Sequence, residues 1–165
     1  MKIKTISVFA ILVLIAMTLF AQEKFSGQWT INTAKSDFGG APAFTMPASI
    51  NLNQKNDSLL VEFNGADRNG QAYTASARYK LDGTVVEKTT VEGGKLKASM
   101  KWTGDHKGFI KSQEYFSSSD AGKVYRSVNE TWKVAPDGTL TIQQNTRIAD
   151  KPESNYIIKA VYQKQ

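Results

Sequence analysis

Cysteine is absent from this chain, and histidine occurs once, as His106. Disulfides are therefore excluded, as are metal sites built from thiolates and imidazoles, so the fold must rest on its hydrophobic core. Only carboxylate sites for hard cations are left, and the acidic residues show no calcium-loop spacing. Glycine-rich phosphate-binding motifs are also missing. The sequence thus predicts a protein without a metal or cofactor.

Long apolar runs are missing beyond Phe20, which leaves one such run at the start of the chain. Lys2 and Lys4 precede it, Ile6 to Phe20 form it, and the small residue Ala21 follows it. A basic start, an apolar centre and a small residue at the cleavage point are typical of a signal peptide. The apolar stretch is about 15 residues long and falls short of the roughly 20 that span a bilayer, although a retained anchor is the alternative.

We therefore predict a signal peptide at residues 1–21 and a single domain at residues 22–165. The protein is expected to be exported, to a periplasm or to the outside of the cell, with no stable membrane anchor after cleavage. Cleavage would remove two lysines and leave 19 basic against 15 acidic side chains, so the net charge would fall from +6 to +4.

The basic residues are spread along the chain and form no compact patch with aromatic residues, so no nucleic-acid partner is expected. We predict that the dispersed lysines lie on a solvated outer face and protect strand edges. They are Lys80, Lys88, Lys95, Lys97, Lys101, Lys111 and Lys133.

Helical periodicity is also missing after the leader, whereas apolar and polar residues alternate with a period of two. This alternation predicts ten strands, at residues 28–33, 48–55, 59–64, 71–81, 84–92, 95–102, 109–116, 123–134, 139–148 and 156–163. Four dipeptides typical of tight hairpins lie between strands: Asn69-Gly70, Asp82-Gly83, Gly93-Gly94 and Asp137-Gly138. The pattern predicts an all-β protein, a single antiparallel up-and-down barrel of about 8–10 strands, because closure removes exposed sheet edges.

Small residues on one predicted inward face indicate a cavity. Tyr73, Ala75, Ala77 and Tyr79 share a face of their strand, and the two alanines leave volume unfilled. A tryptophan from across the barrel would fill the same volume, and the sequence does not decide between the two.

Charged residues also fall on a predicted inward face. Arg126 and Glu130 alternate with the same parity as Val128 and Trp132, yet they are about 13 Å apart along an extended strand and cannot pair directly. Each therefore needs a cross-strand partner, water or a ligand. The alternative is a bulge that turns both side chains to solvent. We predict that the ligand-binding residues are Tyr73, Tyr79, Met100, Tyr115, Arg126, Glu130 and Trp132.

Gly27-Gln28-Trp29 opens the first predicted strand and resembles the Gly-x-Trp element of lipocalins. The wider pattern is similar to small secreted bacterial lipocalin-like, calycin-type β-barrel proteins of unassigned function. This pattern consists of Lys35-Ser36-Asp37-Phe38-Gly39 after Trp29, then Glu130-Thr131-Trp132 and Asp137-Gly138-Thr139-Leu140. The resemblance implies that Trp29 closes one end of the barrel and that a basic residue stacks on it, either Arg147 or Lys159. It also implies that residues 34–47 form a lid over the open end. Alternatively, Phe38 and Phe44 in this loop plug the barrel.

The leading functional hypothesis is an exported binding protein, expected to be monomeric, that holds a small, mainly hydrophobic or amphiphilic ligand in the barrel lumen. The alternative is an envelope accessory module with a filled barrel that contacts a protein or glycan through its loops. No catalytic residues are predicted, and His106 is the one candidate base if the protein were a barrel-fold isomerase or hydrolase.

Overall fold

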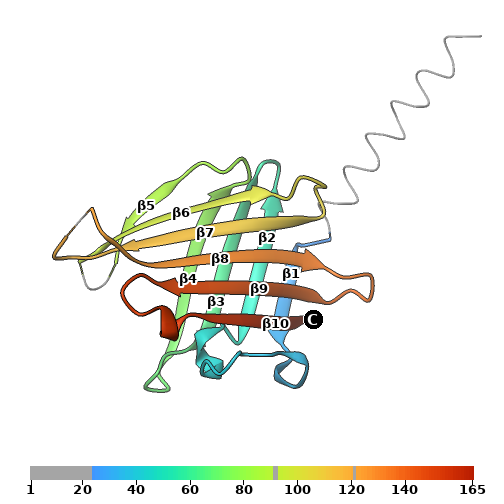
Figure 1. Ribbon diagram of the computed structural model, residues 1–165. Coiled ribbons are helices and arrows are strands. Elements are labelled where there is room, and N and C mark those ends of the chain that lie inside the picture. The colour runs from blue at the N-terminus through green and yellow to red at the C-terminus, as the bar shows by residue number, and fades with distance from the viewer. Residues whose placement is uncertain (1–23, 91–92, 121) are drawn as a thin grey trace, which may run out of the picture.

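The structure is a computed structural model that describes residues 24–90, 93–120 and 122–165. The predicted signal peptide lies outside these residues. Ten antiparallel strands form one sheet that curls into a nearly closed barrel (Figure 1). The strands are β1 (Gly27–Ile31), β2 (Ser49–Lys55), β3 (Ser58–Ala66), β4 (Ala72–Lys80), β5 (Val86–Thr89), β6 (Lys95–Trp102), β7 (Gly108–Phe116), β8 (Val124–Val134), β9 (Leu140–Ile148) and β10 (Tyr156–Lys164).

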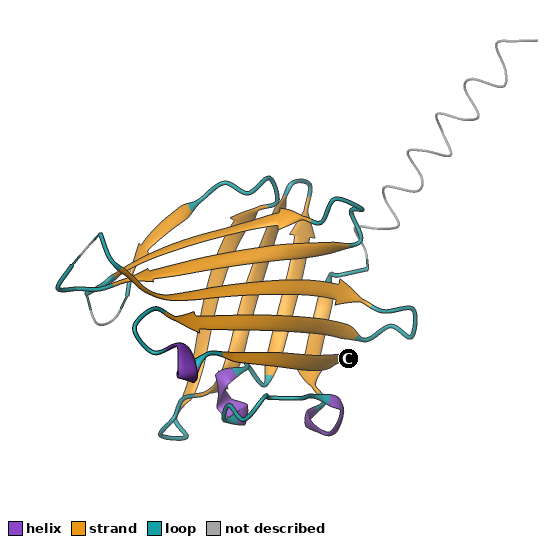
Figure 2. Ribbon diagram, in the orientation of Figure 1, coloured by secondary structure: helices purple, strands orange, loops and turns teal. Residues whose placement is uncertain are grey.

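Three 3₁₀ helices, η1 (Thr33–Lys35), η2 (Ala43–Thr45) and η3 (Pro152–Ser154), lie at one end of the barrel (Figure 2). Within the described residues, no helix has the length and apolar character needed to cross a membrane.

The strand order β4-β3-β2-β1-β10-β9-β8-β7-β6-β5 confirms the predicted up-and-down barrel. All ten predicted strands are present, and β6 has the predicted bounds. The largest difference is in β5, which was expected at 84–92 and forms only Val86–Thr89, although residues 91–92 lie outside the described part. Local signals suffice here because side-chain alternation and turn residues act over a few positions.

The prediction of a hairpin at Asp82-Gly83 is wrong. After β4 the chain bonds to β6: the Trp102 amide donates to the Leu81 carbonyl at 3.2 Å, and the Gly83 amide donates to the Met100 carbonyl at 3.0 Å. Within the described residues β4 and β5 share no ladder, so they end the sheet on its two sides. We call the gap between these unpaired edges the seam. The seam leaves the barrel nearly, rather than fully, closed.

Aromatic side chains fill the end of the barrel opposite the 3₁₀ helices. The Phe109 ring centroid lies 4.4 Å from that of Phe25 and 4.4 Å from that of Trp102. Trp29 is fully buried, and its indole nitrogen donates to the Phe25 carbonyl at 2.9 Å. These contacts close this end of the barrel to solvent.

The basic residue on Trp29 differs from both candidates. Lys164 Nζ lies 5.5 Å from the Trp29 ring centroid, so the expectation of Arg147 or Lys159 is wrong. The physical reason is the register: β1 pairs with β10, and Trp29 lies opposite Lys164. Arg147 and Lys159 point outward and are exposed.

The loop of residues 34–47 covers the other end of the barrel. It is bonded to β10, because the Asp37 and Lys159 backbones exchange hydrogen bonds of 2.9 and 2.7 Å, and the Tyr162 hydroxyl donates to the Pro47 carbonyl at 3.0 Å. Gly39 adopts a positive φ of 56°, and a Cβ there would collide with the carbonyl oxygen of Ile157. The close approach of loop and strand therefore requires glycine.

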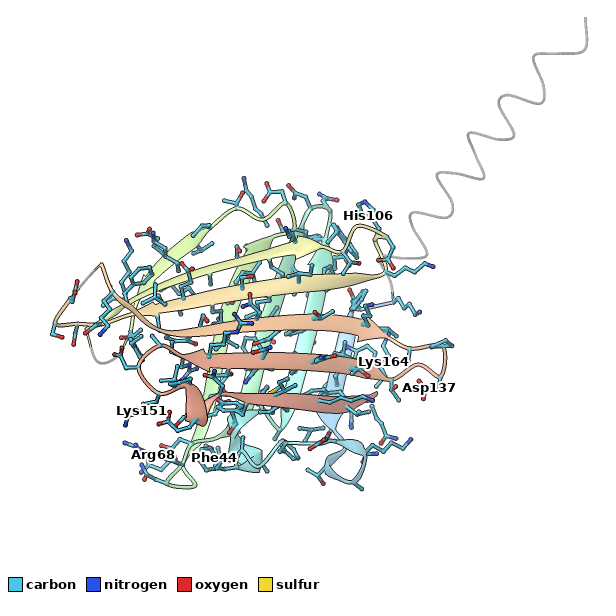
Figure 3. All side chains as sticks on the ribbon, in the orientation of Figure 1. Phe44, Arg68, His106, Asp137, Lys151 and Lys164 are labelled. Carbon is cyan, nitrogen blue, oxygen red and sulfur yellow. The ribbon has the colours of Figure 1, made fainter. Side chains whose placement is uncertain are left out.

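The expectation that two phenylalanines plug the barrel is wrong for one of them. Phe38 packs against the core, but Phe44 is 46% exposed (Figure 3). Met46 from the same loop is buried instead. We call this loop the lid.

Candidate ligand-binding site

A cavity of about 230 Å³ remains inside the barrel. Five of the seven predicted ligand-binding residues line it: Tyr73, Tyr115, Arg126, Glu130 and Trp132. Tyr79 and Met100 are buried in the core and do not line this cavity. Of the two small residues on β4, Ala75 lines the cavity, even though Trp132 reaches the same space, whereas Ala77 packs against the core.

A buried ion pair crosses the cavity wall. Lys111 on β7 lies opposite Glu130 on β8, and Lys111 Nζ is 3.0 Å from Glu130 Oε1. Each residue is only 6% exposed. The second carboxylate oxygen, Oε2, accepts a hydrogen bond of 2.7 Å from the Trp132 indole. Both oxygens of Glu130 are thus engaged, by a cross-strand lysine and by a neighbour on its own strand.

The prediction that Lys111 lies on the outer face is wrong. Lys111 has the same parity on β7 as the buried Phe109, so its side chain points inward. Its ammonium lies 5.3 Å from the Phe63 ring centroid and 6.0 Å from that of Trp132. The residue type suggested solvent, but two-residue alternation was the better signal.

Unlike Glu130, Arg126 has no oppositely charged partner among the described residues. Its guanidinium lies 4.3 Å from the centroid of the Tyr115 ring. Its Nε is buried and has no hydrogen-bond partner. In the described part of the chain, no carboxylate lies within ion-pair distance of Arg126. Arg126 therefore carries the positive charge of the cavity that no protein group neutralises.

A bulge does exist near this site, but it does not turn Arg126 or Glu130 to solvent. The register between β7 and β8 shifts between Tyr115 and Phe116. From Arg126 to Val134 the pairing with β9 is continuous. Both charged residues therefore keep the inward parity predicted from Val128 and Trp132.

Buried ionisable groups at and beside the cavity have shifted pKa values. Burial raises the pKa of the Tyr162 and Tyr79 hydroxyls above the ordinary value of 10.0. Burial works to lower the pKa of Lys111, but the charge of Glu130 and other neighbouring groups outweighs it, so this pKa is raised above 10.5. In the folded state all three groups hold their protons more tightly than in the unfolded chain.

Alkaline pH is expected to destabilise the protein. The unfolded chain releases the protons of these three groups from about pH 10 upward, while the folded state still retains them, so stability is complete below that pH and falls above it. Each group adds up to about 1.4 kcal/mol of lost stability per pH unit. Urea unfolding between pH 8 and 11.5 measures the free energy of unfolding as a function of pH. Tyr162→Phe should make its fall with pH less steep, by up to about 1.4 kcal/mol per pH unit, because one proton fewer is released on unfolding. An unfolding free energy that stays constant up to pH 11.5 would contradict the expectation.

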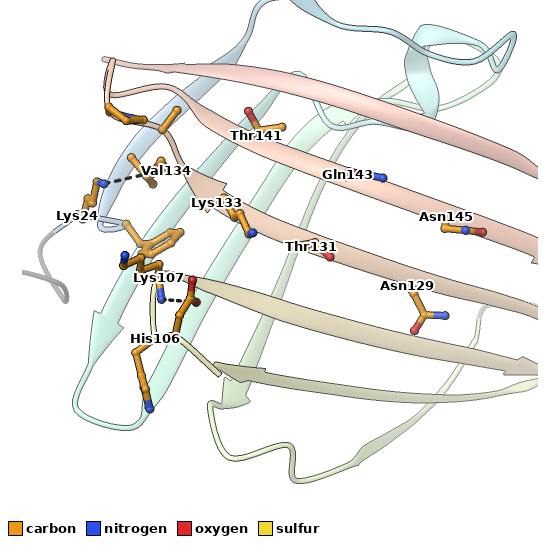
Figure 4. A pocket seen from close by; sticks show the side chains of 14 residues that line it. Lys24, His106, Lys107, Asn129, Thr131, Lys133, Val134, Thr141, Gln143 and Asn145 are labelled. Atoms are coloured by element: carbon orange, nitrogen blue, oxygen red, sulfur yellow. Dashed lines mark hydrogen bonds between the residues drawn. The ribbon is translucent and has the colours of Figure 1, made fainter. Parts of the chain in front are cut away.

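A larger hollow of about 950 Å³ lies outside the barrel, over the outer face of β8 and β9 (Figure 4). Polar side chains such as Asn129, Thr131 and Gln143 point into it, because they alternate with the buried residues of their strands. His106 is at its rim.

His106 lies in the turn between β6 and β7, with a φ of 53°. It is exposed, and its ring lies 5.9 Å from that of Trp102. The neighbouring Asp105 carboxylate accepts hydrogen bonds from the Thr103 hydroxyl and the Lys107 amide, not from His106. Across the described ranges, His, Asp and Glu side chains form no group of three that could hold a metal ion.

Comparisons of the chain with known proteins give no indication of its function. No protein-family model and no curated protein matches the chain. What the protein does must therefore be inferred from the cavity, its charges and its opening to solvent.

Proposed function

We propose that the protein is an exported, lipocalin-like binding protein that holds a small, mainly hydrophobic ligand in the barrel lumen. One observation supports this most: the barrel keeps a cavity between aromatic and aliphatic side chains, with a few polar groups aimed into it. Such a combination is typical of small-molecule sites. A barrel that served only as a scaffold would be expected to fill this space to ordinary packing density.

The seam is the proposed entrance. The aromatic cluster of Phe25, Trp102 and Phe109 closes one end of the barrel, and the lid is bonded to β10 at the other. Tyr73 and Ala75 line the cavity and are nevertheless exposed, because β4 has no partner strand on this side. A ligand would therefore enter sideways, past the free edge of β4.

The volume limits the ligand. About 230 Å³ is below the roughly 300–1,000 Å³ of sites for drug-sized molecules. The ligand would be either very small or long enough to protrude through the seam.

Filling the cavity is expected to abolish binding. Ala75→Trp places an indole in the lumen, whereas Ser76→Trp places the same ring on the outer face of β4 and is the matched control. We expect Ala75→Trp to weaken the binding of 1-octanol and benzyl alcohol at least tenfold, and Ser76→Trp to leave it unchanged. Calorimetric titration measures both. Equal affinities in all three proteins, or no binding to the wild type, would contradict a lumenal site.

The alternative function is an envelope module that contacts a protein or glycan through its lid, and the exposure of Phe44 favours it. It does not account for the free lumen. Phe44→Ser separates the two hypotheses, because it should abolish docking to envelope components and leave small-molecule binding intact. We propose no catalytic activity, since in the described chain no nucleophile or acid is hydrogen-bonded to the His106 side chain.

A further inference from the structure

We infer that the lumen selects a small monocarboxylate, whose anionic group pairs with Arg126 and whose apolar part enters the barrel. This inference rests on the proposed function and adds the chemical class of the ligand. Four features support this inference: the charges of the lumen, the unpartnered donor of the Arg126 guanidinium, the change in exposure along the cavity, and the cavity volume.

The charge balance of the lumen favours an anion. The Lys111 ammonium and the Glu130 carboxylate are 3.0 Å apart and neutralise each other, and Trp132 occupies the remaining carboxylate oxygen. Both oxygens of Glu130 are therefore already engaged by protein donors, and its charge is balanced by Lys111. Arg126 is the third charged residue lining the cavity, and no protein carboxylate pairs with it in the described residues. The lumen presents one net positive charge.

The guanidinium of Arg126 offers donors for two-point binding. The Tyr115 ring lies 4.3 Å from its central carbon and so covers one face of the plane. The donors at the edge of a guanidinium match the two oxygens of a carboxylate. On Arg126, Nε is buried and makes no hydrogen bond. A buried donor without a partner destabilises the protein. A bound carboxylate would accept a hydrogen bond from Nε and remove this penalty.

Exposure along the cavity indicates which part of the ligand points inward. Arg126 and Tyr73 are partly exposed, so they lie toward solvent. Ile50, Ile142 and Trp132 line the same cavity and are at most 1% exposed. The polar group would stay near the opening, and the apolar part would contact the buried residues.

The volume sets the size of the apolar part. At about 30 Å³ for each water-sized group, the cavity of about 230 Å³ holds roughly eight non-hydrogen atoms. An aromatic acid with one ring meets this limit. A longer alkyl chain would have to leave through the seam.

The test compares acids with their neutral amides of almost the same shape: benzoate with benzamide, phenylacetate with phenylacetamide, and octanoate with octanamide. Calorimetric titration at pH 7 gives the affinity of each. In the wild type we expect at least one acid to bind ten times or more tightly than its amide. Arg126→Gln should remove this preference. Arg147→Gln is the matched control, because it removes an exposed arginine from the outer face of β9 and should keep the preference.

Three results would overturn the inference, and they separate it from the proposed function. Equal binding of acids and amides by the wild type would refute the anion preference and leave the lumenal site standing. A preference that persists in Arg126→Gln would place the anion elsewhere. No binding of any acid or amide, or of the neutral alcohols above, would refute both proposals. The wild-type comparison needs no variant, so a folding defect in Arg126→Gln would not affect it.

Discussion

Breaking the buried ion pair from either side is expected to lower the free energy of unfolding by about 3–5 kcal/mol. Lys111→Met leaves the Glu130 carboxylate buried with only the Trp132 indole as a partner, and Glu130→Gln leaves the Lys111 ammonium buried without a counter-charge. Removing one charge forfeits the attraction, while the desolvation of the other charge remains.

The double variant Lys111→Met/Glu130→Gln is expected to recover most of this loss, because it buries no charge and the introduced amide oxygen can still accept the hydrogen bond from the Trp132 indole. Urea unfolding of the wild type, both single variants and the double variant measures the coupling. Glu87→Gln is the control: Glu87 pairs with Lys95 at 2.9 Å, but this pair is exposed and should contribute less than about 1 kcal/mol. Single variants as stable as the wild type, or additive losses in the double variant, would contradict the role given to the pair.

Trp29→Ala is also expected to lower the free energy of unfolding by about 3–5 kcal/mol. Trp29 is fully buried beside the aromatic cluster, so its removal leaves a large cavity at the closed end of the barrel. It also leaves the Phe25 carbonyl without its indole donor. Chemical denaturation at neutral pH measures the loss.

Two further variants separate the contributions of Trp29. Trp29→Phe keeps a ring and removes the indole donor, so its cost should be smaller than that of alanine. Lys164→Gln removes the cation over the ring and should cost about 1 kcal/mol or less, because Lys164 is exposed. A Trp29→Ala protein that unfolds within about 1 kcal/mol of the wild type would show that other side chains close this end.

Most of the predicted site residues line the cavity, because their position depends on parity along single strands. Arg126 and Glu130 share parity with Val128 and Trp132, and the structure places both in the cavity wall. Tyr73 and Tyr115 line the cavity for the same reason. Met100 has the right parity but lies in the filled core, because parity gives the face of a strand and not the depth along the barrel.

Lys111 was wrongly predicted to face solvent, because lysine is usually exposed and its inward parity with Phe109 on β7 was not used. Its partner is opposite it in the ladder, and strand register depends on turns and bulges on both sides. The same reason applies to Lys164, which the pairing of the first strand, β1, with the last strand, β10, brings over Trp29.

The alternation of side chains and the turn residues determine that this chain forms ten antiparallel strands in sequence order, because both act between neighbouring residues. Closure of the barrel depends on the tertiary structure. Whether β4 meets β5, which end the lid covers, and which charge is left unpaired in the lumen all depend on contacts between distant segments. Those contacts are decided by the curvature and register of the whole sheet, which no local pattern encodes.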